Sequence, residues 1–296
     1  MESESGPEAT PDPAGAEAAA EAAAELSPQP ATKNEGLWDT IRFLLIVFLA
    51  ALVLRTFVVA PFSIPSGSML PRLMIGDYLF VAKWPYGYSR YSLPFGIAGF
   101  EGRVLGSLPE RGDVIVFRYP GPENEDYVKR VIGLPGDTVQ VRGGQIFLNG
   151  QPVQRHRIGD YLMPISPNSP CRMVGEDAAR VVPAEDGTRL CAYARYRETL
   201  PGGRSYEVLD QISDAPADDT ELFQVPEGHV FVMGDNRDDS QDSRYAVEEG
   251  GVGMLPADHI LGRALITFFS TDGSARWLKP WTWFSAARWD RIGRTF

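Results

Sequence analysis

The chain carries one long apolar segment, and its other hydrophobic positions fall in short runs. The long segment is uninterrupted from Phe43 to Leu54 and is bounded by Arg42 and Arg55. With its apolar flanks it reaches roughly 20 residues, the length that a helix needs to cross a bilayer. The pattern predicts a transmembrane anchor over residues 37–60, although a buried core helix or a cleaved secretory signal gives a similar pattern. The acidic stretch before the segment favours a retained anchor, while the few basic residues on either side leave its orientation open.

After this segment come short runs rich in Val, Ile, Phe and Tyr, separated by Gly, Pro and Asp. Such runs predict a mainly β fold, with antiparallel sheets packed as a sandwich or partial barrel. Gly143-Gly144 and Asn149-Gly150 predict hairpin turns between neighbouring strands. The predicted strands are residues 78–82, 114–119, 127–132, 138–141, 145–148, 229–233 and 262–269.

The same patterning divides the chain into parts. Residues 1–36 are dominated by Ala, Glu, Pro and Ser, a composition that predicts a disordered acidic tail. The alternation weakens over residues 151–224, and we expect an inserted smaller subdomain there because long structureless loops are rare in compact domains. The segments on either side, 61–150 and 225–276, form the main β-domain. Residues 277–296 mix Trp with Arg, which is typical of a membrane interface but also of a terminal segment packed on a sheet.

Composition narrows the functional classes. The 296 residues carry a formal net charge of -11, which argues against a nucleic-acid-binding surface. His156, His229 and His259 show no metal-binding spacing, and two cysteines are too few for a zinc site, so we expect no metal and no cofactor. Cys171 and Cys191 form either one disulfide or two buried free thiols.

The candidate nucleophile is Ser68, in the motif PSGSMLP shortly after the predicted anchor. A serine hydroxyl needs a base within hydrogen-bond reach, and none of the histidines lies in a suitable motif. Strand alternation places Lys129 on the same face as Tyr127 and Val131. Burial on that face would lower the pKa of the amine and leave it neutral, whereas an ordinary surface lysine would stay charged.

A polar motif, residues 234–244, follows the strand predicted at residues 229–233. By itself GDNRDDSQDSR is either a polar turn or a scaffold that orients a base. Together with PSGSMLP, RGDVIVFRYP and DYVKRVIGLPGD, in this order behind an apolar segment, it resembles bacterial type I signal peptidase. The resemblance implies a serine endopeptidase with a Ser-Lys dyad, which removes amino-terminal signal peptides from exported preproteins. It also implies a single-pass protein of the bacterial inner membrane, with the acidic tail in the cytoplasm and the catalytic domain on the periplasmic face.

The resemblance assigns roles to individual residues. Ser68 would be the nucleophile, and Lys129 the general base that takes its proton. The backbone N–H of Ser68 and the hydroxyl of Ser66 would stabilise the oxyanion, while Ser240 would hold the lysine amine by a hydrogen bond. Asp242 and Arg244, in the same motif, would form an ion pair that braces the loop.

Substrate recognition is expected beside the serine, in shallow apolar pockets that accept small residues of the Ala-X-Ala type. The residues expected to line these pockets are Phe62, Ile64, Met69, Leu73 and Tyr127. An oxidising periplasm would permit a disulfide between Cys171 and Cys191. Expected partners are preproteins and the lipid bilayer, with no nucleic acid and no obligate protein partner. The alternative class is a membrane-tethered β-domain that binds partners and catalyses nothing.

Overall fold

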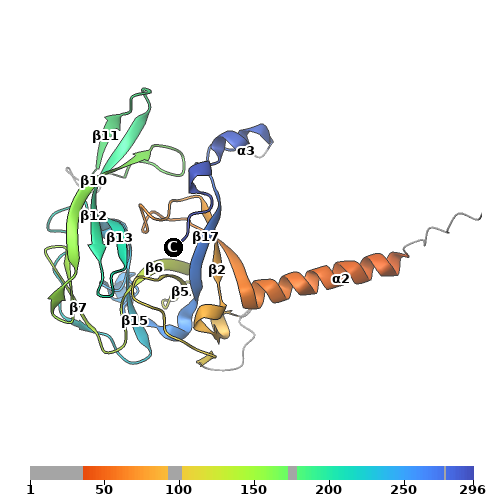
Figure 1. Ribbon diagram of the computed structural model, residues 1–296, viewed down its shortest axis with the longest axis horizontal. Coiled ribbons are helices and arrows are strands. Elements are labelled where there is room, and N and C mark those ends of the chain that lie inside the picture. Colours follow the sequence, from red (N-terminus) through yellow and green to blue (C-terminus); the bar gives the residue numbers. More distant parts are fainter. Residues whose placement is uncertain (1–35, 93–101, 173–178, 277) are drawn as a thin grey trace, which may run out of the picture. The chain divides into compact units, whose positions relative to one another are not determined.

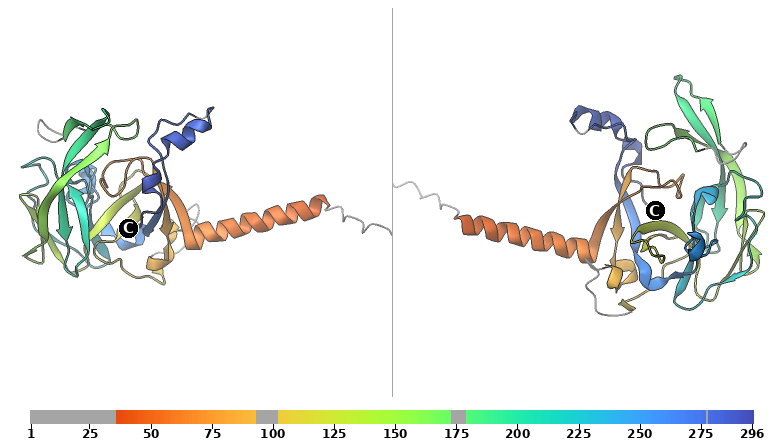
Figure 2. Two further views of the ribbon diagram at one scale, coloured as in Figure 1. Left: turned by 45° about the horizontal axis from the view of Figure 1, so that its top comes forward. Right: turned by 180° about the vertical axis from the view of Figure 1, so that it is seen from behind.

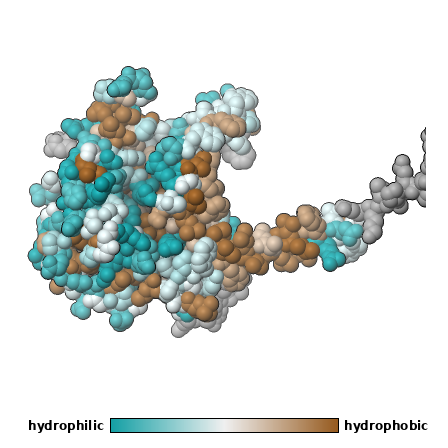
Figure 3. All heavy atoms as spheres, in the orientation of Figure 1, coloured by the Kyte–Doolittle hydropathy of each residue, from teal (hydrophilic) through white to brown (hydrophobic). Residues whose placement is uncertain are grey.

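A computed structural model describes residues 36–92, 102–172, 179–276 and 278–296, so nearly all of the predicted acidic tail lies outside the described residues. The chain divides after Leu49 into two units, the second of which is Ala50–Phe296. The helix α2 (Leu37–Val53) continues into a short π-helical segment, η1 (Leu54–Val58). No residue of α2 is buried, and Figure 3 shows its apolar surface. Among the described residues this is the one helix long and apolar enough to cross a membrane, which fits an anchor and not a buried core helix.

The main sheet is antiparallel and seven-stranded (Figure 1). Its fourth strand is buried on both faces, as its apolar run from Val114 to Phe117 requires. Ile115 and Phe117 face one core cluster, while Val114 and Val116 face another. In sheet order the strands are β1 (Val59–Ser63), β2 (Asp77–Ala82), β17 (Ile260–Ser270), β5 (Val114–Arg118), β6 (Asp126–Gly133), β15 (His229–Met233) and β16 (Leu255–Pro256). The mainly β fold expected from the sequence is therefore confirmed.

The segment predicted as an insertion forms its own long strands. A second antiparallel sheet has the order β10 (Gln154–Pro164), β12 (Arg189–Thr199) and β11 (Ala179–Pro183), with β13 (Ser205–Leu209) also paired to β12. Figures 1 and 2 show this sheet across from β2 and β17, with the carboxy terminus between them. A shared core cluster joins Val208 of β13 to Phe231 of β15. The second sheet thus packs against the main β-domain and is not a detached module.

Hairpin turns occur at both predicted positions. Gly143 and Gly144 have φ angles of 53° and 72°, and Asn149 and Gly150 have φ angles of 52° and 76°. Positive φ at both central residues is what a two-residue hairpin turn of this twist needs, which explains the glycines. The turns connect the strands of a small sheet, with the order β14 (Phe223–Gln224), β7 (Thr138–Arg142), β8 (Gln145–Leu148) and β9 (Gln151–Pro152).

The remaining elements are short. A two-stranded sheet joins β3 (Tyr88–Ser89) to β4 (Arg103–Val104). The carboxy-terminal segment forms one turn and a half of helix, α3 (Trp281–Ala286). The single-turn helices are η2 (Trp84–Tyr86), η3 (Arg90–Ser92), η5 (Arg237–Asp239), η6 (Val247–Glu249), η7 (Ala257–His259) and η8 (Trp289–Arg291).

Cys171 and Cys191 form a disulfide, which decides between the two possibilities left open by the sequence. The bridge closes a loop with a sequence separation of 20 residues and ties it to β12. Cross-linking stabilises a fold mainly by restricting its unfolded chain.

We therefore expect the double substitution Cys171→Ser/Cys191→Ser to lower the free energy of unfolding by about 3 kcal/mol, the value typical of a loop of this length. Urea unfolding of the detergent-solubilised chain measures this, and reductant added to the unsubstituted protein should reproduce the loss. Equal unfolding midpoints with and without reductant would contradict the prediction.

Candidate active site

The nucleophile candidate lies on a tight segment that follows β1. Ser68 is 6% exposed, and the turn around it is closed by a hydrogen bond from the Leu70 N–H to the Gly67 carbonyl. The backbone N–H of Leu73 donates to the carbonyl of Met69, which continues the turn. Since Met69 and Leu73 are fully buried, the apolar side of this turn is fixed in the core. The segment therefore holds the serine in one place.

Lys129 meets this serine from β6. Its Nζ atom donates to Ser68 Oγ over 2.9 Å and to the Val128 carbonyl over 3.2 Å. The residue is 4% exposed, and its Nζ lies 5.5 Å from the centre of the Tyr127 ring. The inward orientation expected from strand alternation is confirmed.

Burial makes the amine of Lys129 unusually acidic. Desolvation lowers its pKa from the ordinary lysine value to about 8, because a buried ammonium loses its hydration. Asp242 acts against this shift and Arg244 acts with it. Because the two are paired with each other, their opposing charges leave desolvation as the dominant influence.

The predicted oxyanion partner Ser66 lies next to the dyad. Its hydroxyl oxygen is 3.4 Å from Ser68 Oγ, and the residue is exposed. An exposed hydroxyl beside the buried Ser68, the candidate nucleophile, is accessible to a peptide that approaches from solvent. The geometry is therefore compatible with the expected role of Ser66.

The expected hydrogen bond between Lys129 and Ser240 is absent from the described part of the chain. The lysine amine is directed to Ser68 and to its own preceding carbonyl. Ser240 is buried and packs against Gly234, where an added Cβ would lie 2.3 Å from Ser240 Oγ. The structure thus places Ser240 beside Ser68 without the expected hydrogen bond to the amine.

The polar loop is braced by buried ion pairs. Asp242 and Arg244 form the expected pair, with Arg244 Nε 2.9 Å from Asp242 Oδ1. Burial alone would raise the pKa of Asp242, but the charge and hydrogen bonds of Arg244 hold that pKa below its usual value. The Asp242 carboxylate also accepts the Gly234 N–H over 3.0 Å, so the pair fixes the start of the loop.

Two further buried pairs join this loop to other strands, and the sequence alone did not indicate them. Arg130 of β6 binds Asp235 through both carboxylate oxygens, at 2.7 and 2.6 Å. Arg237 binds Glu198 of β12 at 2.8 and 2.5 Å. A buried pair of this kind is costly to break, because the remaining charge would stay desolvated.

The residues expected to line substrate pockets fall into two groups. Ile64, Met69 and Leu73 are at most 3% exposed and belong to one core cluster, against which the partly buried Phe62 packs. Tyr127 belongs to a second cluster and stacks on Tyr119, with ring centres 4.7 Å apart. The first group is thus the packed floor of the region beside Ser68, and Phe62 supplies surface that a peptide can reach.

Asn236 is a contact residue that the sequence did not single out. Its backbone N–H donates to the Ser68 carbonyl over 3.0 Å, and its side-chain Nδ2 donates to the Gly67 carbonyl over 3.1 Å. It is 2% exposed. The only available signal was its place in the polar motif, which carries no information on long-range contacts.

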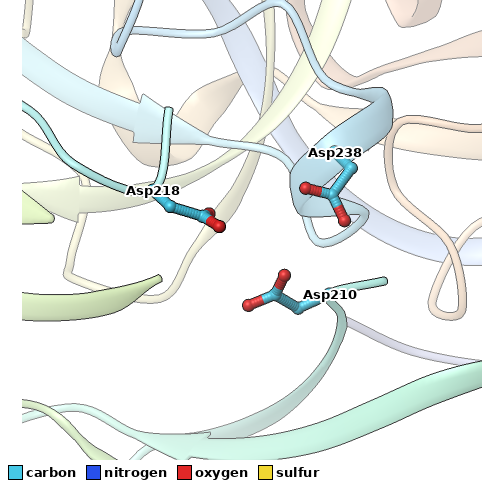
Figure 4. A group of neighbouring side chains, drawn as sticks. All are labelled: Asp210, Asp218 and Asp238. Atoms are coloured by element: carbon cyan, nitrogen blue, oxygen red, sulfur yellow. The ribbon is translucent and has the colours of Figure 1, made fainter. Parts of the chain in front are cut away.

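Three carboxylates, from Asp210, Asp218 and Asp238, point toward one another beside this loop (Figure 4), with their ligand atoms within 4.8 Å. Each already has a partner within the protein. Arg155 pairs with Asp210, the Ala215 N–H donates to Asp218, and the Gln211 N–H donates to Asp238. Burial, followed by the neighbouring acids, raises the pKa of Asp218 and that of Asp238.

A carboxyl whose pKa is raised by folding destabilises the folded state once pH rises above its unfolded value. We therefore expect Asp218→Asn to raise the free energy of unfolding by roughly 1 kcal/mol at pH 7, since the amide oxygen still accepts the Ala215 N–H. The gain should vanish below about pH 4, where the carboxyl is protonated in both states. Thermal unfolding at the two pH values tests this, and an equal gain at both would contradict it.

The structure brings Ser68 and the buried Lys129 together on an antiparallel β-domain, and comparison with known proteins supplies the class, that of a peptidase. The chain belongs to the family of signal peptidases, peptidase S26, whose family model matches residues 37–269. This membership makes the chain a peptidase and decides against the non-catalytic binding domain considered from the sequence.

Two curated relatives agree with this family, and one solved structure is also similar. Signal peptidase I of Rickettsia typhi is 38% identical over 233 residues, 76% of this chain and 77% of the relative. Signal peptidase I of Rickettsia canadensis is 34% identical over 278 residues, 87% of this chain and 91% of the relative. A crystal structure of a signal peptidase I from Enterococcus faecalis V583 is 26% identical and covers 53% of this chain and 97% of its own, with a TM-score of 0.27.

Proposed function

We propose that this protein is a membrane-anchored endopeptidase that cleaves amino-terminal signal peptides from exported preproteins, with Ser68 as nucleophile and Lys129 as general base. The observation that carries the proposal is the 2.9 Å hydrogen bond from Lys129 Nζ to Ser68 Oγ inside a buried site. A serine becomes nucleophilic when a base this close can accept its proton. Family membership supports the substrate class.

The reaction proceeds in two halves. Ser68 Oγ attacks the scissile carbonyl carbon as its proton passes to the neutral Lys129 amine, and the carbonyl oxygen becomes an oxyanion. The Ser68 N–H and the Ser66 hydroxyl stabilise that charge. The C–N bond then breaks, the lysine returns its proton to the leaving amine, and the signal peptide remains as an ester on Ser68. A water that gives a proton to Lys129 hydrolyses the ester, and Ser68 recovers its hydroxyl proton.

Small residues before the cleaved bond suit the packing of the site. Ile64, Met69 and Leu73 are packed in the core, so little depth remains beneath a substrate side chain beside Ser68. A large side chain would have to displace that floor, whereas alanine would not. This packing supports cleavage of the Ala-X-Ala type.

The membrane is the second partner. The apolar helix Leu37–Val58 serves as a single-pass anchor in the inner membrane, with the β-domain on the periplasmic face, where a disulfide is stable. The carboxy-terminal segment exposes large apolar side chains suited to the headgroup region. These are Leu278, Trp281, Phe284 and Trp289, with exposed fractions of 93%, 69%, 71% and 60%.

Replacing either member of the dyad should abolish cleavage. We expect Ser68→Ala and Lys129→Ala to lower kcat by a factor of at least about 10³, since the first removes the nucleophile and the second leaves it without a base. Ser63→Ala, an exposed serine of β1, is the matched control and should retain the activity of the unsubstituted protein. Cleavage of a purified preprotein in detergent measures all three, and a Lys129→Ala variant within tenfold of the control would overturn the proposed base.

The pH dependence should report the same amine. Only the neutral form of Lys129 accepts a proton, so kcat/KM should rise with pH through an apparent pKa of about 8. At pH 7 about a tenth of the molecules would carry a neutral Lys129 amine that can accept a proton. The pH profile of preprotein cleavage tests this, and a midpoint near 6.5, as for a histidine base, would contradict it.

A further inference from the structure

A chain of hydrogen bonds joins the second sheet to the nucleophile. Gln211 follows β13 and is 9% exposed, and its Nε2 donates to Asn236 Oδ1 over 3.0 Å. Asn236 Nδ2 in turn donates to the Gly67 carbonyl. The link therefore runs from the segment predicted as an insertion to the peptide bond that precedes Ser68.

The Gly67–Ser68 peptide bond contains the Ser68 N–H, the backbone donor proposed to stabilise the oxyanion. The carbonyl of Gly67 and the N–H of Ser68 belong to one planar unit, and in a trans peptide they point in opposite directions. The Gly67 carbonyl accepts both Asn236 Nδ2 and the Leu70 N–H of the turn, and the Asn236 N–H donates to the carbonyl of the next peptide unit, that of Ser68. With the Gly67 carbonyl directed at Asn236 Nδ2, the Ser68 N–H of the same planar unit points away from that side chain.

The position of Asn236 is itself set from the second sheet. The Leu209 N–H donates to the Asp235 carbonyl over 2.8 Å. The Asp238 carboxylate accepts the N–H groups of Gln211 and Ile212, at 2.6 and 3.1 Å. These bonds dock residues 209–212 onto the polar loop on both sides of Asn236, so that the Gln211 side chain meets the Asn236 amide in a fixed geometry.

We infer that Gln211 is a positioning residue for the reaction: through Asn236 it fixes the peptide plane that directs the Ser68 N–H at the oxyanion. The inference rests on the proposed function, since it needs Ser68 to be the nucleophile. An oxyanion donor is effective only when it is aimed before the charge develops. Loss of the link should therefore weaken stabilisation of the transition state and leave binding of the substrate unchanged.

The test measures kcat and KM of the full chain in detergent with a preprotein substrate. Gln211→Ala should lower kcat about tenfold and Asn236→Ala about thirtyfold, part of the 10²–10³ that a lost oxyanion donor costs, with KM within about twofold. The midpoint of the pH profile should stay in place because Lys129 is untouched. Gln211→Met, which keeps a similar length and removes the N–H donor without adding a charge, is the second variant if Gln211→Ala fails to fold.

A purely structural role is separated by a ligand that resembles the transition state. A peptide aldehyde ending in alanine adds Ser68 Oγ to its carbonyl and places an oxyanion where the N–H points, so its affinity should fall in parallel with kcat/KM. The affinity of the corresponding uncleavable peptide amide should not change. A structural defect alone would lower the folded fraction and leave the aldehyde affinity per folded molecule unchanged.

The control is Gln140→Ala, which removes a glutamine whose Nε2 donates to the Thr220 carbonyl at 3.0 Å, away from the dyad. It should keep the kcat of the unsubstituted protein. If Ser68→Ala is inactive but the Gln211 variants keep kcat and aldehyde affinity within twofold, the inference is wrong. If Ser68→Ala itself remains active, the proposed function fails whatever the Gln211 variants do.

Discussion

The arrangement of the site depends on excluding water from the amine of Lys129. In the proposed mechanism Lys129 accepts a proton from Ser68, which requires a neutral amine, and burial is the dominant cause of its lowered pKa. An unpaired carboxylate beside the amine would restore the charge and cancel the effect. Asp242 and Asp235 lie close enough to influence the amine, yet each is paired with an arginine, Arg244 or Arg130. The buried ion pairs therefore preserve the neutrality of their neighbourhood, and this is a reason for their presence that stability alone does not give.

This constraint also explains why the second sheet lies where it does. Polar groups that surround a dry site must find partners within the protein, since water is excluded. Glu198 on β12 satisfies Arg237, and Gln211 beyond β13 satisfies Asn236. The segment that interrupts the main β-domain in sequence thus completes its hydrogen bonding in space.

Features that depend on neighbouring residues could be predicted from the sequence, whereas contacts between distant strands could not. The hairpin glycines at 143–144 and the inward face of Lys129 depend on neighbours within a few residues, and both were predicted correctly. The partners of Arg130 and Arg237 come from distant strands, and no local pattern encodes such pairings. The case of Ser240 is intermediate: its motif placed it near Lys129 and Ser68, but its hydroxyl is packed close to Gly234 and makes no hydrogen bond to the amine. Proximity could be predicted from the motif, whereas the hydrogen-bond partner could not.

Gly234 sets a limit on how this site can change. A Cβ atom at this position would lie 2.6 Å from the Ser68 carbonyl oxygen as well as 2.3 Å from Ser240 Oγ, both far inside van der Waals contact. Every other amino acid would therefore push the polar loop off the nucleophile segment, and the opposing atoms include a backbone carbonyl that has no rotamer to escape into. The two segments thus approach each other too closely at Gly234 to admit any side-chain carbon. A laboratory-evolution library that varied this position should return glycine alone, even though its side chain takes part in no chemistry.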